Sequence, residues 1–134
     1  MTWHYSERSL SFLDSCDPRL RALFREALEY QDITIVSGKR GEAEQNELVR
    51  VGRSERVYPR SKHNAEPWSL AVDAMPYPVD YNDRERITLF AGFIKGLAAG
   101  KFNVRIRWGG DWDGDWSTRD NVFDDLGHFE LLPK

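Results

Sequence analysis

The sequence predicts an α+β fold in which a small, mostly antiparallel sheet is accompanied by about three helices. Segments with helical spacing of apolar residues alternate with short β-branched or alternating segments. No internal repeat or linker interrupts this order. A chain of 134 residues also has the size of one ordinary domain. We therefore expect residues 1–134 to form a single domain with one core.

Three segments have the features of helices. Residues 17–30 begin with Asp17 as the expected N-cap and Pro18 at the first helical position. Residues 42–52 form a second expected helix, which Gly52 closes. Residues 83–100 carry an apolar stripe at helical spacing and are expected to end at Gly100.

Four segments have the features of strands. Residues 33–38 are a β-branched run that ends at a glycine, and residues 69–78 are strand-like as far as Pro76. Residues 102–108 alternate between apolar and polar positions, which predicts a strand with one buried face. The last short strand is expected at residues 128–132. Residues 53–67 show no periodicity and predict a long ordered loop.

The charge of the chain is unevenly distributed. A net charge of −3 argues against a general nucleic-acid binder, which needs clustered Lys and Arg. Residues 39–62 contain seven basic and four acidic residues, whereas residues 111–125 contain six aspartates and one arginine. These two segments are either two walls of one cleft or separate solvated loops.

The sequence predicts a protein made in the cytoplasm. Cys16 is the only cysteine, so no internal disulfide can form. The first residues lack the features of a signal peptide, and no window approaches the length of an apolar membrane span. If the target lies outside the cytoplasm, another component must let the protein through.

His63, Asp73 and His128 are candidate metal ligands. A catalytic zinc ion typically takes three protein ligands and leaves a fourth position for water. Asp73 is the most informative, because a carboxylate within an apolar run is costly unless it is paired or binds a metal. A salt bridge to an arginine explains Asp73 equally well, and single histidines are usually ordinary surface or core residues. The residues alone therefore leave both interpretations open.

The segment DWDGDW imitates the start of a calcium-binding EF-hand loop. It places Asp111, Asp113 and Asp115 at alternate positions. Trp116 stands where the loop needs glycine and Val122 where it needs glutamate, so the EF-hand pattern fails. A weak calcium site of another type stays open.

Four segments, SKHN, LAVDAMPYP, RWGGDW and FDDLGHFEL, occur in this order along the chain. They resemble the successive motifs of the VanY-like zinc peptidases, which share the fold of D-alanyl-D-alanine carboxypeptidases and hedgehog domains. The chain is most similar to phage endolysins that act as L-alanyl-D-glutamate peptidases. Segments nearer the N-terminus follow the same branch, so the resemblance covers nearly the entire chain. It implies a hedgehog/DD-peptidase-like zinc peptidase fold.

The resemblance also implies roles for five residues. His63, Asp73 and His128 fall at the positions of the three zinc ligands, so the implied cofactor is Zn²⁺. Asp125 falls at the position of the catalytic carboxylate. Arg40 falls at the position of an arginine that helps to bind the substrate and polarise the scissile carbonyl. An ion pair with a nearby carboxylate, that of Asp73 among them, is the structural alternative for Arg40.

The chain departs from the commoner family pattern in its longer, glycine-free segment between the first two ligands. Glu66 lies in that segment and competes with Asp73 as a ligand. Glu130 competes with Asp125 as the proton acceptor, because residues two apart on a strand share the face of His128. The family comparison favours Asp125 and gives Glu130 a supporting part.

The function implied by the resemblance is a zinc-dependent endopeptidase that cuts the L-alanyl-D-glutamate bond of peptidoglycan stem peptides as a phage lysis enzyme. A D,D-carboxypeptidase or dipeptidase acting on D-alanine termini is one alternative. A non-catalytic, metal-containing cell-wall-binding domain is another. The expected partner is a bacterial peptidoglycan peptide, without nucleic acid or membrane. We expect a monomer that leaves the host cytoplasm through a holin.

Overall fold

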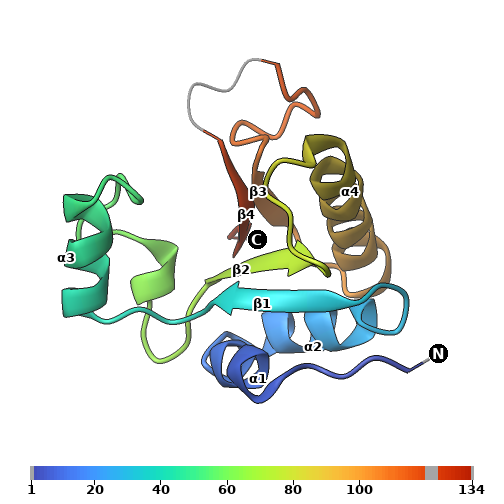
Figure 1. Ribbon diagram of the computed structural model, residues 1–134, viewed down its shortest axis with the longest axis horizontal. Coiled ribbons are helices and arrows are strands. Elements are labelled where there is room, and N and C mark those ends of the chain that lie inside the picture. Colours follow the sequence, from blue (N-terminus) through green and yellow to red (C-terminus); the bar gives the residue numbers. More distant parts are fainter. Residues whose placement is uncertain (1, 120–123, 134) are drawn as a thin grey trace.

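The computed structural model describes residues 2–119 and 124–133. Its helices are α1 (Glu7–Asp14), α2 (Pro18–Ala27), α3 (Glu42–Arg50) and α4 (Arg84–Lys101), with a short 3₁₀ helix at Lys62–Asn64. Its strands are β1 (Ile33–Ser37), β2 (Ala71–Pro76), β3 (Ile106–Gly109) and β4 (Asp125–Leu131). The strands pair antiparallel in the order β1-β2-β4-β3 (Figure 1). The predicted α+β class and antiparallel sheet are confirmed.

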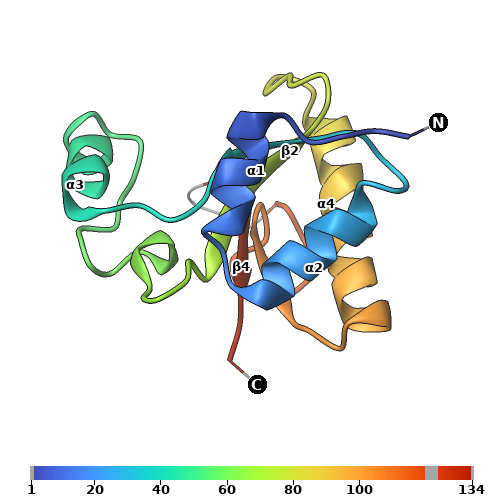
Figure 2. The same ribbon diagram turned by 90° about the horizontal axis from the view of Figure 1, so that it is seen from below.

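Helices α1, α2 and α4 lie against the sheet, whereas α3 stands beyond the C-terminal end of β1 (Figures 1 and 2). Side chains of a strand alternate between its two faces. Val72, Ala74 and Phe129 belong to the hydrophobic core. Asp73 lies between Val72 and Ala74 on β2, and His128 precedes Phe129 on β4. Both side chains therefore point to the opposite face. The sheet thus separates a hydrophobic core from a polar surface.

Phe129 joins β4 to two helices. Its side chain is fully buried, and its ring meets the rings of Phe24 on α2 and Phe90 on α4 edge-on. The ring centroids are 5.8 Å and 6.0 Å apart, respectively. Such pairs contribute about 0.5–1.5 kcal/mol beyond the burial of their area. Phe129 therefore anchors the strand that also carries His128.

Helix α1 was not predicted, so the structure has four described helices where about three were expected. This helix has only eight residues, and helices this short are marginal in isolation. The Ser6 hydroxyl accepts the backbone N–H of Ser9 at 3.1 Å, and Leu13 is buried in the core. Among the helices formed by residues 2–119 and 124–133, none has the length and apolar content needed to cross a membrane.

The strand predicted at residues 102–108 is shorter than expected, because β3 begins at Ile106. Helix α4 continues through Gly100 and ends at Lys101. Asn103 then adopts a φ of 54°, a left-handed conformation that stops a helix and that asparagine tolerates. The apparent alternation therefore includes the helix exit as well as the strand.

Strand β4 begins at Asp125, three residues before its predicted start at His128. Asp125 pairs with Gly109 on β3 after an irregularity in the register. A Cβ atom at position 109 would lie 2.0 Å from the carbonyl oxygen of Asp125. Glycine at position 109 therefore permits the close approach that extends β4.

We expect Phe129→Ala to lower the free energy of unfolding by about 3–5 kcal/mol, because it leaves a cavity where β4, α2 and α4 meet. Urea unfolding followed by circular dichroism measures this loss. Leu89→Ala on α4 is the control, since Leu89 is 77% exposed and should change stability by less than about 0.5 kcal/mol. Similar losses for both variants would contradict the central place of Phe129.

Candidate functional site

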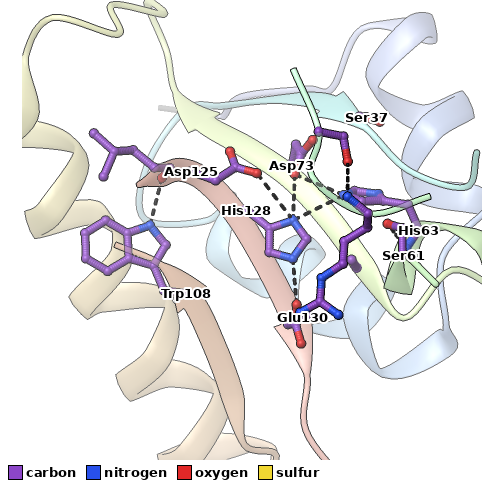
Figure 3. Close-up of polar contacts among 12 residues, drawn as sticks. Ser37, Ser61, His63, Asp73, Trp108, Asp125, His128 and Glu130 are labelled. Carbon is purple, nitrogen blue, oxygen red and sulfur yellow. Dashed lines mark hydrogen bonds and ion pairs between the residues drawn. The ribbon is translucent and has the colours of Figure 1, made fainter. Parts of the chain in front are cut away.

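The register of β2 and β4 brings Asp73 and His128 together. The two residues are direct partners in the antiparallel pair. Directly opposed side chains have Cβ atoms about 4.5–5.5 Å apart, close enough for their polar ends to meet. His128 Nδ1 lies 3.2 Å from Asp73 Oδ1, and Figure 3 shows the two side chains turned toward each other.

His63 lies in the loop between α3 and β2, and its side chain contacts Asp73 and His128. A short 3₁₀ helix inside this predicted loop places it: the Ser61 hydroxyl accepts the backbone N–H of His63 at 3.1 Å. The Asn64 side chain accepts the backbone N–H of Ser61 at 3.1 Å, which closes the turn. The His63 ring is buried, and its Nδ1 lies 2.7 Å from the carbonyl oxygen of Gly38. The loop therefore fixes both the position and the orientation of this ring.

His63, Asp73 and His128, called here the ligand cluster, present three atoms at the corners of a nearly equilateral triangle. Each pair among His63 Nε2, Asp73 Oδ1 and His128 Nδ1 is separated by 3.2 Å. Ligand atoms bound about 2.0–2.2 Å from a tetrahedral metal ion lie about 3.3–3.6 Å from one another. The triangle therefore fits one face of a tetrahedral metal site and leaves the fourth position free.

Hydrogen bonds on the far side of each ring determine which nitrogen faces the ligand cluster. A carbonyl or carboxylate oxygen can only accept, so the proton of His63 lies on Nδ1, toward Gly38. The proton of His128 lies on Nε2, 2.8 Å from Glu130 Oε1. The remaining nitrogens turn their lone pairs toward the carboxylate of Asp73. Three acceptors that converge in this way need a cation between them.

The pKa values of Asp73 and His128 are both shifted in the direction that favours a positive charge between the three acceptors. Burial opposes ionisation of Asp73, but attraction from the two histidines outweighs it and holds its pKa well below the usual range. Burial lowers the pKa of His128, but hydrogen bonds with Asp73 and Glu130 outweigh this effect and raise it to about 9. Without a metal ion, the cluster therefore holds a proton at neutral pH.

Glu130 supports His128 from behind. One oxygen of its carboxylate accepts from His128, and the other accepts from Arg107 at 2.7 Å. Burial opposes ionisation of Glu130, but these hydrogen bonds outweigh it and lower its pKa to about 2. A partner of this kind orients a metal-binding histidine and fixes its tautomer. These contacts hold the His128 ring in place, and the functional part of Glu130 stays a prediction.

Arg40 forms an ion pair with Asp73. Such a pair is the structural alternative that the sequence left open for Arg40. Its Nη2 donates to Asp73 Oδ2 at 2.8 Å. Its Nε donates to the Ser37 hydroxyl at 3.2 Å, and its Nη1 donates to Gln45 Oε1 at 3.4 Å. One oxygen of Asp73 is thus held by Arg40 while the other faces the histidines. Three of the five guanidinium N–H donors are used in these contacts.

Asp125 lies beside the ligand cluster, at the first residue of β4. Its Oδ2 is 3.9 Å from His128 Nδ1, and its side chain is 42% exposed. Partial burial and then repulsion from Asp73 raise the pKa of Asp125. A carboxyl group that is partly open to solvent and holds a proton more readily than usual is suited to proton transfer.

A pocket of about 440 Å³ opens over Asp125 and His128. The loop after α3 contributes to its lining, and so does the segment after β3, which lies on the other side of β4 in Figure 1. Trp112 lines the pocket with its ring 5.3 Å from that of His128. The basic and acidic segments of the sequence therefore border one pocket, as the first of the two interpretations predicted.

Glu66 and a group of three aspartates, the other acidic candidates, lie outside the ligand cluster. Glu66 pairs with Lys39 at 2.7 Å and has a largely exposed side chain, so it does not replace Asp73 in the ligand cluster. The carboxylates of Asp111, Asp113 and Asp115 gather within 4.8 Å of one another. Exposed acidic groups often gather without an ion, so a calcium site here stays a prediction.

Gln45 was not recognised from the sequence. It is fully buried on α3, and its side chain accepts from Arg40 and donates to the Ser54 hydroxyl and to the carbonyl oxygen of Arg56. A glutamine among glutamates on a short helix has the pattern of a solvent-facing residue. Its role becomes visible only when the loop after α3 is seen to fold back over it.

Comparisons with known proteins identify a matching family and a similar solved structure. Residues 1–132 match the model of a family described as phage L-alanyl-D-glutamate peptidase. No curated protein matches the chain significantly. Among the solved structures that match is the crystal structure of the Serratia marcescens L-Ala D-Glu endopeptidase ChiX, with a TM-score of 0.75 and 27% sequence identity. The match covers 96% of this chain and 90% of the solved chain.

We expect the metal-free protein to bind one divalent cation and to release about one proton at about pH 7. The reason is that the ion replaces the proton held by His128, whose pKa is about 9. The release should therefore fall as the pH is raised through about 9. Calorimetric titration in two buffers of different ionisation enthalpy measures the number of protons. A matched titration of Asp73→Asn should show much weaker binding, and equal affinity would argue against the ligand cluster.

Proposed function

The chain belongs to the phage L-alanyl-D-glutamate peptidase family, and we propose that it acts on peptidoglycan as a zinc-dependent enzyme through the ligand cluster. It is a peptidoglycan endopeptidase, since its family is described as L-alanyl-D-glutamate peptidase and its structural neighbour as an L-Ala D-Glu endopeptidase. The observation that carries the zinc proposal is the triangle of three lone pairs, each 3.2 Å from the others. Further roles are proposed for Asp125 and Arg40.

His63, Asp73 and His128 are the proposed zinc ligands. Two imidazole nitrogens and one carboxylate oxygen form a donor set that suits catalytic zinc. A zinc ion bound there lowers the pKa of a water molecule toward about 7 and polarises a carbonyl oxygen. Each of the three side chains is also held on its far side by a hydrogen bond. The donors are therefore arranged before the metal binds.

Asp125 is the proposed general base and general acid. It lies within reach of the free side of the ligand cluster and is open to the pocket. It can take a proton from the attacking water and return it to the amine that leaves when the peptide bond breaks. Glu130 is less suited to this transfer, because both of its oxygens already accept hydrogen bonds.

Arg40 is proposed to act in two ways. Its contact with Asp73 Oδ2 fixes the carboxylate so that Oδ1 faces the histidines. The two N–H donors that these contacts leave over can serve the oxygen of the scissile carbonyl, since a guanidinium presents its donors in a rigid fork. In this proposal the ion pair with Asp73 and the catalytic role belong together.

We further propose that the enzyme is a phage endolysin that acts as a monomer through one catalytic domain formed by residues 1–134. The hydrophobic core cluster joins side chains from α1, α2, α4 and all four strands, which supports a single domain. The substrate lies in the cell wall. A protein made in the host cytoplasm must therefore pass the membrane, and a holin is the proposed route.

We expect chelation to abolish cleavage of purified peptidoglycan and zinc to restore it, because the ligand cluster loses its cation. Mass spectrometry of the fragments should find new N-terminal D-glutamate. Release of D-alanine instead would assign the enzyme to the carboxypeptidase alternative. No product from the zinc-loaded protein would favour a binding domain.

We expect Asp125→Asn to lower kcat by about 10²–10⁴-fold, because proton transfer contributes about this much. Zinc content should stay that of the unmodified protein, since Asp125 is outside the ligand cluster. Asp124→Asn is the matched control, because the Asp124 carboxylate pairs with Arg84 and should leave kcat within a few-fold. Full activity of Asp125→Asn would disprove the assigned base.

A further inference from the structure

Four cationic side chains in the pocket lack a partner among the described residues. Arg53, Arg56, Arg60 and Lys62, called here the cationic wall, line the pocket together with Asp125 and His128. Within residues 2–119 and 124–133, none of the four side chains forms a hydrogen bond or an ion pair. Arg107, by contrast, lines the same pocket but is already paired with Glu130. The cationic wall is therefore available to an anionic group of a ligand.

The cationic wall is attached to the ligand cluster. The buried side chain of Gln45 donates to the carbonyl oxygen of Arg56 and accepts from Arg40, which in turn donates to Asp73. The backbone N–H of Arg53 also donates to the carbonyl oxygen of Leu48 at the end of α3, at 2.8 Å. The loop that carries these cations is therefore held in a defined place relative to the reacting centre.

Most acidic side chains of the pocket and its unpaired cations come from different segments of the chain. Asp113 and Asp125 line it from the segment after β3 and from β4, whereas the cationic wall comes from the loop after α3. Glu55 is an acid on that same loop, but the unpaired cations outnumber it. An anionic substituent is attracted to the loop and repelled from Asp125, so a substrate that carries one is oriented in the pocket.

The proposed function identifies such a substituent, and the inference rests on that function. A glutamate that is linked to alanine through its amine carries two carboxyl groups. When the peptide continues through one of them, the other remains a free carboxylate on the residue next to the scissile bond. We infer that the cationic wall binds this free carboxylate and that the enzyme discriminates against substrates in which it is amidated.

The expected discrimination is at least about tenfold in kcat/KM. Hydrogen bonds to an ionised carboxylate are stronger than those to a neutral amide, and the difference for one such contact corresponds to about a factor of ten. Because the pocket is open to solvent, added salt should weaken the preference. An amide group also carries N–H donors, and arginine side chains have no acceptor for them.

The test uses two synthetic peptides that contain the L-alanyl-D-glutamyl bond and differ only in whether the free carboxylate is amidated. The zinc-loaded full chain should cleave the acid at least about tenfold more efficiently, as measured by chromatography with mass spectrometry. The combined Arg53→Gln, Arg56→Gln and Arg60→Gln variant should lose this preference through slower cleavage of the acid. Its rate on the amide should fall much less than its rate on the acid.

A matched variant controls for the change in net charge. Arg8→Gln, Arg25→Gln and Arg105→Gln together remove three exposed arginines outside the pocket, and this variant should keep the preference. Equal cleavage of the two peptides by the unmodified enzyme would overturn the inference while leaving the proposed function intact. Equal loss on both peptides in the pocket variant would overturn it too. Cleavage of neither peptide would overturn the proposed function and the inference together.

Discussion

The antiparallel register of β2 and β4 is the constraint on which the site depends. It sets Asp73 opposite His128 and places both on the face turned away from the core. A slip of one residue would send these side chains into the core and bring Val72 and Phe129 out. The burial of Phe129 between α2 and α4 therefore does more than stabilise the fold. It excludes the registers in which the polar pair would be separated.

Around this pair, each polar side chain of the site is held by another whose own position is fixed. Arg40 holds Asp73, and Gln45 holds Arg40 while also fastening the loop after α3. Buried charges are costly unless their partners are placed well. The chain of contacts meets this requirement and also links the shape of the pocket to the position of the ligand cluster. A disturbance of the loop can therefore reach Asp73 without any change in the core.

Local patterns in the sequence predict those parts of the fold that neighbouring residues determine. The N-cap at Asp17 and the apolar run around Asp73 are of this kind, and Asp73 stood out because a carboxylate is misplaced in such a run. His63 and His128 are 65 residues apart, so no compact spacing marks them as a pair. The residue types alone made them candidate ligands without deciding the matter, and the resemblance to a known family favoured the metal site. Gln45 carries no local mark, because its partners lie in a loop whose path depends on tertiary contacts.

The two carboxylates nearest His128 illustrate how position divides chemical roles. Glu130 is buried, accepts from both His128 and Arg107, and has its pKa lowered to about 2, so it remains charged and holds the ring. Asp125 is partly open to the pocket, and burial together with repulsion from Asp73 raises its pKa. Paired groups whose environments shift their pKa values in opposite directions are suited to different tasks. The same strand therefore supplies a fixed anion on one side of His128 and a group able to exchange a proton on the other.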